Sequence, residues 1–128
     1  MEVLSGMRFG EFLQQRIFGP LNMTDSSFTI AADSVSRLAQ IYSPRGVRGG
    51  NFFAPATGPG LDVAPPEVSI RYLEGGAFES GGGGLLSTAR DYMRFAQMLL
   101  NGGELDGVRL LSPKTIALMT IKPHGQVT

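Results

Sequence analysis

The stretch with the strongest chemical character is a run of four glycines, Gly81–Gly84, preceded by Ser80 and followed by LLSTARDYMRF. Backbone amides of a glycine-rich turn at a helix start can hold an anion. A phosphate loop of the form G-x-x-x-x-G-K-[ST] needs a lysine that this stretch lacks. The pattern G-x-G-x-x-G also fails, because Ser87 stands in the place of the third glycine. The run therefore favours a loop whose bare backbone passes close to another group, with anion binding as the less favoured alternative.

A serine nucleophile would need a base at a suitable spacing, and no such pair is present. The single histidine, His124, lies in the tail KPHGQVT and is expected to be a solvated residue. G-x-S-x-G is absent around Ser80, because Phe78 stands two places before it. S-x-x-K is absent as well, since Lys114 follows Ser112 by only two positions. The residues thus predict no catalytic group.

Metal and cofactor chemistry have few candidate ligands. The chain has no cysteine, and Glu104 and Asp106 flank a predicted turn, where carboxylates are usually solvated. No Asp or Glu is expected on an apolar helix face, which argues against a buried carboxylate pair. We therefore predict no metal site and no cofactor.

The charge and hydropathy of the chain argue against nucleic acid and membranes as binding partners. The 11 basic and 11 acidic residues balance, and Lys114 and Lys122 are the only lysines, which counts against nucleic-acid binding. No apolar run approaches the roughly 20 residues of a membrane helix. The N-terminal MEVLSGMRF has no long apolar core, so we expect neither a signal peptide nor a membrane anchor in this sequence. These features leave the compartment open.

Apolar spacing and capping residues predict the elements. A helix is expected over 8–18 and an extended piece over 27–30; a second helix is expected over 33–42. Thr88 and Asp91 form a T-x-x-D capping box that starts a third helix, which ends before Asn101-Gly102-Gly103. Asp106-Gly107 predicts a two-residue hairpin, and Ser112-Pro113 caps a fourth helix.

The segment 43–76 holds most of the prolines and has no clear periodicity, so we expect a long irregular loop with one extended piece over 68–73. The tail 122–128 is expected to fray. The predicted fold over residues 1–128 is therefore a single, mainly α unit with one short β-hairpin and this long loop.

Three segments together resemble the serine beta-lactamase-like hydrolases, which include class C beta-lactamases, DD-peptidases and related esterases. They are SGMRFGEFLQQRIFGPLNMTDSSF, RLAQIY and GGGGLLSTARDYMRFAQMLLNGGELDGVRLLSPKTIALMT. The resemblance leaves out 43–74, which is variable in that family. It implies part of an α+β enzyme, mostly its helical domain, and a bacterial parent that is cytoplasmic or periplasmic.

The catalytic motifs of that family are missing from these residues. S-x-x-K is absent, and none of Tyr42, Tyr72 or Tyr92 stands in a Y-x-N. Lys114-Thr115 is followed by Ile116, so K-T-G is absent, and no H-x-G occurs either. The resemblance therefore implies a piece of an acyl-serine enzyme that is inactive alone.

By the same resemblance, Ser80, Gly81, Gly82, Gly83 and Gly84 line one edge of a cleft for a small ester or amide. Class C beta-lactamases often carry an aromatic residue where Gly83 stands, and a glycine there implies a wider pocket of the esterase kind. The alternative is a non-enzymatic interaction module. Its exposed apolar helix faces would bind a partner or a second copy of the chain.

Overall fold

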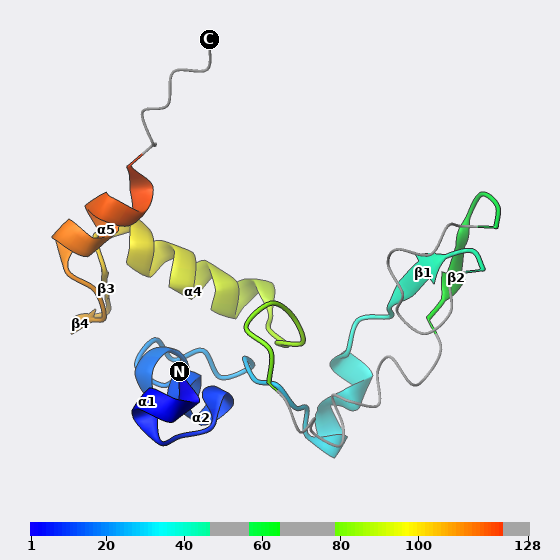
Figure 1. Ribbon diagram of the computed structural model, residues 1–128, viewed down its shortest axis with the longest axis horizontal. Helices are drawn as coiled ribbons and strands as arrows, with labels where there is room; N and C mark the ends of the chain where they lie inside the picture. The colour runs from blue at the N-terminus through cyan, green and yellow to red at the C-terminus, as the bar shows by residue number, and fades with distance from the viewer. Residues whose placement is uncertain (47–56, 65–78, 122–128) are drawn as a thin grey trace, which may run out of the picture. The chain divides into compact units, whose positions relative to one another are not determined.

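The computed structural model describes residues 1–46, 57–64 and 79–121, which fall into two compact units. Unit 1 comprises Met1–Ser26 and Ser87–Thr128, and unit 2 comprises Ser27–Leu86. The described residues contain helices and two separate two-stranded antiparallel sheets (Figure 1). The predicted mixture of helices with a small hairpin is present, whereas the prediction of one domain over 1–128 stays a prediction.

Unit 1 begins with two short helices. The first, α1, spans Glu2–Ser5, and α2 spans Phe9–Leu13 before it continues as the π-helix η1, Gln14–Phe18. The predicted helix over 8–18 is therefore present, although its second half is wound more widely than an α-helix. The N–H of Gly19 donates to the Gln14 carbonyl at 2.8 Å and closes the π turn. A Cβ at Gly19 would lie 2.9 Å from that same oxygen, so the close approach depends on a glycine.

The long helix of unit 1, α4, spans Ala89–Leu100 and starts where the capping box predicts. Thr88 Oγ1 accepts the N–H of Asp91 at 3.2 Å. The helix ends at Asn101, followed by two glycines with positive φ, Gly102 at 70° and Gly103 at 98°. The predicted start and stop signals of this helix are thus confirmed.

The remaining elements of unit 1 also follow the sequence signals. Strands β3, Glu104–Leu105, and β4, Val108–Arg109, form a hairpin. Its turn residues Asp106 and Gly107 have φ of 50° and 80°, as a type I′ turn requires. Helix α5, Pro113–Thr120, begins at Ser112, whose Oγ accepts the N–H of Thr115 at 3.1 Å. The hairpin and the fourth predicted helix are confirmed.

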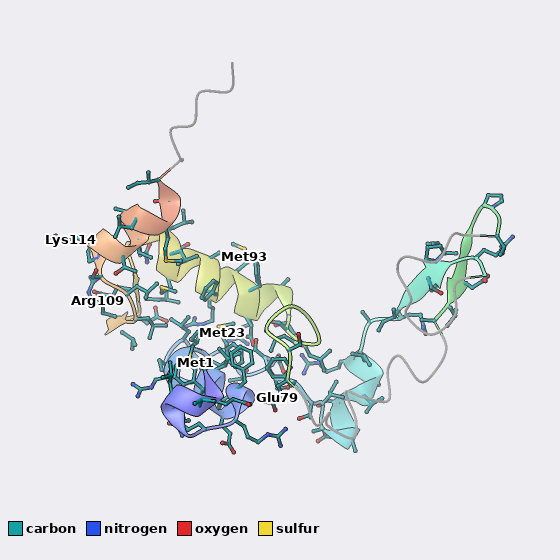
Figure 2. The ribbon with its side chains drawn as sticks, in the orientation of Figure 1. Met1, Met23, Glu79, Met93, Arg109 and Lys114 are labelled. Carbon is teal, nitrogen blue, oxygen red and sulfur yellow. The ribbon has the colours of Figure 1, made fainter. Side chains whose placement is uncertain are left out.

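A small apolar core holds unit 1 together. The buried side chains that meet there come from the end of η1, the segment after it and α4, and they are Phe18, Leu21, Met23 and Met98. In Figure 2, Met23 lies between α4 and the N-terminal helices. Partly buried side chains surround this cluster, namely Leu13, Ile17, Phe95, Leu99, Leu105 and Leu110. Every one of these residues belongs to unit 1.

Unit 2 differs more from the sequence-based expectation. The helix predicted over 33–42 is instead a six-residue 3-10 helix, η2, Ala32–Arg37. It ends at Leu38, whose ψ of 126° is extended. The chain then forms strand β1, Tyr42–Pro44, in which Pro44 disfavours the helical conformation at the preceding Ser43. Val35, Leu38 and Tyr42 therefore do not lie on one helix, and the helix predicted from their apolar spacing is wrong.

The predicted irregular loop over 43–76 contains one strand of a pair and most of the other, which begins at Tyr42, and no sequence signal predicted this pair. Strand β2, Leu61–Val63, pairs antiparallel with β1, and Tyr42 lies opposite Val63. Each strand has only three residues, too few for a recognisable alternation. The extended piece predicted over 68–73 and the frayed tail predicted over 122–128 lie outside the described residues. Of the piece predicted over 27–30, Ser27 forms an isolated antiparallel bridge with Leu86.

Candidate functional site

The predicted cleft edge, Ser80–Gly84, is a compact turn in unit 2. Ser80 Oγ accepts the N–H of Gly82 at 3.1 Å, and the Ser80 carbonyl accepts the N–H of Gly83 at 3.4 Å. This is the local hydrogen bonding by which serine stabilises a turn. Gly81, Gly82 and Gly83 are exposed. Ser80 thus shapes the run, and the three exposed glycines present backbone to solvent.

The glycines of this run are not equally constrained. Gly84 has a φ of 96°, which a residue with a side chain rarely adopts. Among the described residues, a Cβ at Gly83 or Gly84 would meet no atom within 4 Å, and one at Gly82 would meet Ser80 Oγ alone, at 3.7 Å. No described residue approaches the backbone closely at these three positions, and the expected close approach to another group stays a prediction. Only the conformation of Gly84 requires a glycine among them.

The most buried polar group among the described residues is Asp91, in the first turn of α4. Its side chain is 1% exposed, although the sequence analysis expected no carboxylate on an apolar face. Oδ2 accepts the N–H of Asp25 at 2.8 Å and the hydroxyl of Ser26 at 2.9 Å. Bonds to an ionised acceptor are about twice as strong as neutral ones. Asp91 therefore ties the segment after Met23 to the start of α4.

Two serines extend this network. Ser26, which is 3% exposed, has its Oγ 2.8 Å from Ser87 Oγ, so the hydroxyls of both chain segments meet. The pairing joins residues 61 positions apart, which no local spacing reveals. Sequence reasoning assigned Asp91 to the capping box alone, and the repeated pattern of small hydroxyl residues in TDSS and STARD was the one signal available.

Ser26 and Asp91 do not form a catalytic pair. A nucleophile must reach its substrate, and both Ser26 and Asp91 are buried. The bonds of Asp91 are to groups that it holds in place, and no buried side-chain polar atom among the described residues lacks a partner. We read Asp91, Ser26 and Ser87 as structural.

A second polar connection lies across unit 1. Arg94 donates through Nε to the Leu21 carbonyl and through Nη2 to Asp106 in the hairpin turn. Arg109 donates to the carbonyls of Gly102 and Leu111, at 3.0 and 3.2 Å, and pairs with Glu104 across the hairpin. Asp106 and Glu104 therefore serve the packing of the hairpin, as expected for carboxylates around a turn.

Residues 1–46, 57–64 and 79–121 contain neither a cluster of metal ligands nor a membrane-spanning helix. No group of three or more His, Asp or Glu side chains in those ranges could hold a metal ion. No helix there is long and apolar enough to cross a bilayer. His124 lies outside the described residues.

Comparison with known proteins decides the family. The family model described as Beta-lactamase matches residues 1–128. The chain belongs to the Beta-lactamase family. This beta-lactamase-family chain is 39% identical over 109 residues to two curated proteins of Mycobacterium tuberculosis, an uncharacterized protein, MT1414, and protein Rv1367c. The match covers 85% of the chain and 24% of each relative, so the chain spans about a quarter of their length.

A solved structure supports the fold. The chain is similar to simvastatin synthase (LovD) from Aspergillus terreus, with a TM-score of 0.66 and 24% identity. The alignment covers 95% of this chain and 27% of that enzyme. At this identity the likeness concerns the fold alone. The predicted resemblance to the beta-lactamase-like hydrolases is thus confirmed, while the role of Ser80–Gly84 in substrate binding stays a prediction.

Proposed function

We propose that this chain supplies part of the scaffold of a serine hydrolase of the beta-lactamase type, together with one edge of its substrate cleft. The observation that carries the proposal is the family match over residues 1–128, none of which forms S-x-x-K, Y-x-N or K-T-G. The substrate class is a small ester or amide, cleaved in the complete enzyme through an acyl-serine intermediate. Residues 1–128 by themselves carry no hydrolytic activity.

Ser80–Gly84 is the proposed cleft edge. The turn is held by its own serine and presents exposed backbone at Gly81, Gly82 and Gly83. No described atom lies within 4 Å of a Cβ at Gly83, which leaves room for a substrate group where class C beta-lactamases often carry an aromatic side chain. This arrangement favours an esterase-like pocket over a narrower one.

The test is turnover of nitrocefin and p-nitrophenyl butyrate by the purified 128-residue chain. We expect no rate above buffer. The matched control is Ser80→Ala, prepared in parallel, because Ser80 is the one serine of the proposed edge. A rate that survives further purification would contradict the proposal, and a lower rate in the Ser80→Ala chain would assign that activity to Ser80.

A second candidate function is a non-enzymatic interaction module. The observation that favours it is the exposure of large apolar side chains on the helices of unit 1, namely Val3, Leu4, Tyr92, Met93, Leu100, Leu118 and Met119. Met93 lies on the side of α4 that faces away from the N-terminal helices (Figure 2). Exposed apolar surface of this kind marks interaction sites.

Light scattering together with binding of a dye specific for apolar surface tests this candidate. An interaction module would bind the dye and self-associate in a concentration-dependent way. A monomer without dye binding would contradict it.

Anion binding at the start of α4 is disfavoured by charge. The Asp91 carboxylate already lies in the first turn, where it interacts favourably with the positive end of the helix dipole. An anion placed beside Thr88 would meet a like charge, and we do not propose such a site.

A further inference from the structure

Unit 1 is interrupted along the chain, and its two interrupted ends lie together. Its first part ends at Ser26 and its second part begins at Ser87. The hydroxyl oxygens of these two residues are 2.8 Å apart. Sixty residues, 27–86, stand between them in the sequence. Closing so long a loop costs chain entropy, which grows with loop length. Specific bonds at the junction must offset that cost.

Asp91 supplies those bonds within unit 1. One carboxylate oxygen accepts from Asp25 and from Ser26, and Ser26 in turn contacts Ser87. Thr88, next to Ser87, accepts from the N–H of Asp91. The last two residues before the interruption and the first two after it are therefore all held by one hydrogen-bond network, whose buried members are Ser26 and Asp91.

Unit 2 is closed at its own ends in a similar way. The N–H of Ser27 donates to the Leu86 carbonyl at 3.1 Å, and the N–H of Leu86 donates to the Ser27 carbonyl at 2.8 Å. Among its described residues, Ala64 is the one buried apolar side chain, whereas the four-residue core cluster lies wholly in unit 1.

From these observations we propose that residues 27–86 are an inserted module that unit 1 does not need in order to fold. Asp91 is the positioning residue that closes unit 1 across the insertion. The core of unit 1 is made by its own residues, and its interrupted ends are joined by its own hydrogen bonds. The core cluster and the junction hydrogen bonds described above join residues of unit 1 to one another.

If the proposed function holds, the two units have different roles in the enzyme. Ser80–Gly84 belongs to the module, so the module would carry recognition of the substrate and unit 1 would carry support. This consequence alone rests on the proposed function. The folding experiments below do not measure hydrolysis, so either proposal can fail without the other.

The first test removes the module. Residues 27–86 are replaced by a flexible linker of about three residues, which reaches roughly 10 Å and spans the ends of unit 1. Circular dichroism should show a cooperative thermal transition, and the amides of α4 should stay protected from hydrogen exchange. A chain without a cooperative transition would overturn the proposal.

The second test leaves the full chain intact and compares three substitutions by hydrogen exchange. Asp91→Ala should speed exchange in α4 by at least about tenfold, because it leaves the buried Asp25 N–H and Ser26 hydroxyl without their acceptor. Asp91→Asn keeps an acceptor oxygen in the same place and should restore most of the protection. Ala64→Asp, which places a charge at the buried position of unit 2, should leave exchange in α4 within about twofold of the parent.

The contradictory result is equally specific. If Ala64→Asp speeds exchange in α4 as much as Asp91→Ala does, the two units unfold together and the module is not separable. If Asp91→Ala leaves exchange in α4 unchanged, Asp91 does not close unit 1.

Discussion

Two neighbouring glycines at the end of α4 have different surroundings although they share a conformation. Gly102 and Gly103 both have positive φ, and the sequence marks both as a helix stop. A Cβ at Gly102 would meet nothing within 4 Å, whereas one at Gly103 would lie 2.2 Å from the Leu111 carbonyl oxygen. The N–H groups of Leu110 and Leu111 both donate to the Gly103 carbonyl, at 2.9 and 3.2 Å, so the backbones are held together there.

Alanine substitutions at Gly102 and at Gly103 distinguish the cost of backbone strain from the cost of a steric clash with Leu111. Gly102→Ala should lower the free energy of unfolding by about 1–2 kcal/mol, the cost of a left-handed residue with a side chain. Gly103→Ala should cost at least about 1 kcal/mol more, because the Leu111 backbone must also move. Urea unfolding of both variants measures the difference. Equal costs would show that the approach of Leu111 is not part of the folded state.

For single residues, the sequence predicts backbone conformation but does not predict which distant residues they contact. The Asp106-Gly107 dipeptide predicted its own turn, because the type I′ geometry depends only on those two residues. The buried state of Asp91 was not predictable, since it depends on Asp25 and Ser26, more than sixty residues away. The same holds for the open space around Gly83, which no pattern within the glycine run reveals.

At the scale of elements, Arg94 joins α4 to two other parts of unit 1. Its Nε donates to the Leu21 carbonyl, and its Nη2 pairs with Asp106 of the hairpin turn. The Asp106 side chain is 66% exposed, so this ion pair should contribute under about 1 kcal/mol. The bond to Leu21 lies beside the core, because the Leu21 side chain is fully buried. We expect it to be the larger contribution.

A comparison of Arg94→Ala with Asp106→Asn tests that order. Asparagine also tolerates the left-handed conformation at position 106, so the substitution removes the charge and keeps the turn. Asp106→Asn should be neutral within about 1 kcal/mol, and Arg94→Ala should cost about 1.5–3 kcal/mol. Denaturant unfolding supplies both values. A larger cost for Asp106→Asn would mean that the ion pair, and not the carbonyl bond, fixes the hairpin.

Elements with their own caps were predictable, and elements that depend on pairing were not. Thr88 and Ser112 mark the starts of α4 and α5, and the structure places both caps as expected. The strand pair β1–β2 has three residues a strand and no turn signal close to both strands, so its pairing was not visible in the sequence. The 3-10 helix η2 has apolar spacing that fits a longer helix, and Pro44 favours the extended chain that replaces it.

At the scale of the whole molecule, the chain belongs to the Beta-lactamase family but lacks the motifs S-x-x-K, Y-x-N and K-T-G. The family match covers residues 1–128, while the curated relatives are about four times as long as the matched region. Unit 1 carries the core and the buried polar network, and unit 2 carries the proposed cleft edge. We infer a support role for unit 1 and a recognition role for unit 2, with the nucleophile supplied from outside these residues.

Acylation of the chain tests directly whether the nucleophile is supplied from outside these residues. The purified 128-residue protein is incubated with an excess of a fluorescent penicillin and, separately, with an activated phosphonate ester, and its intact mass is measured. Because none of its serines stands in an S-x-x-K motif, we expect an unchanged mass with both reagents. A stoichiometric adduct on any serine of this chain would contradict it.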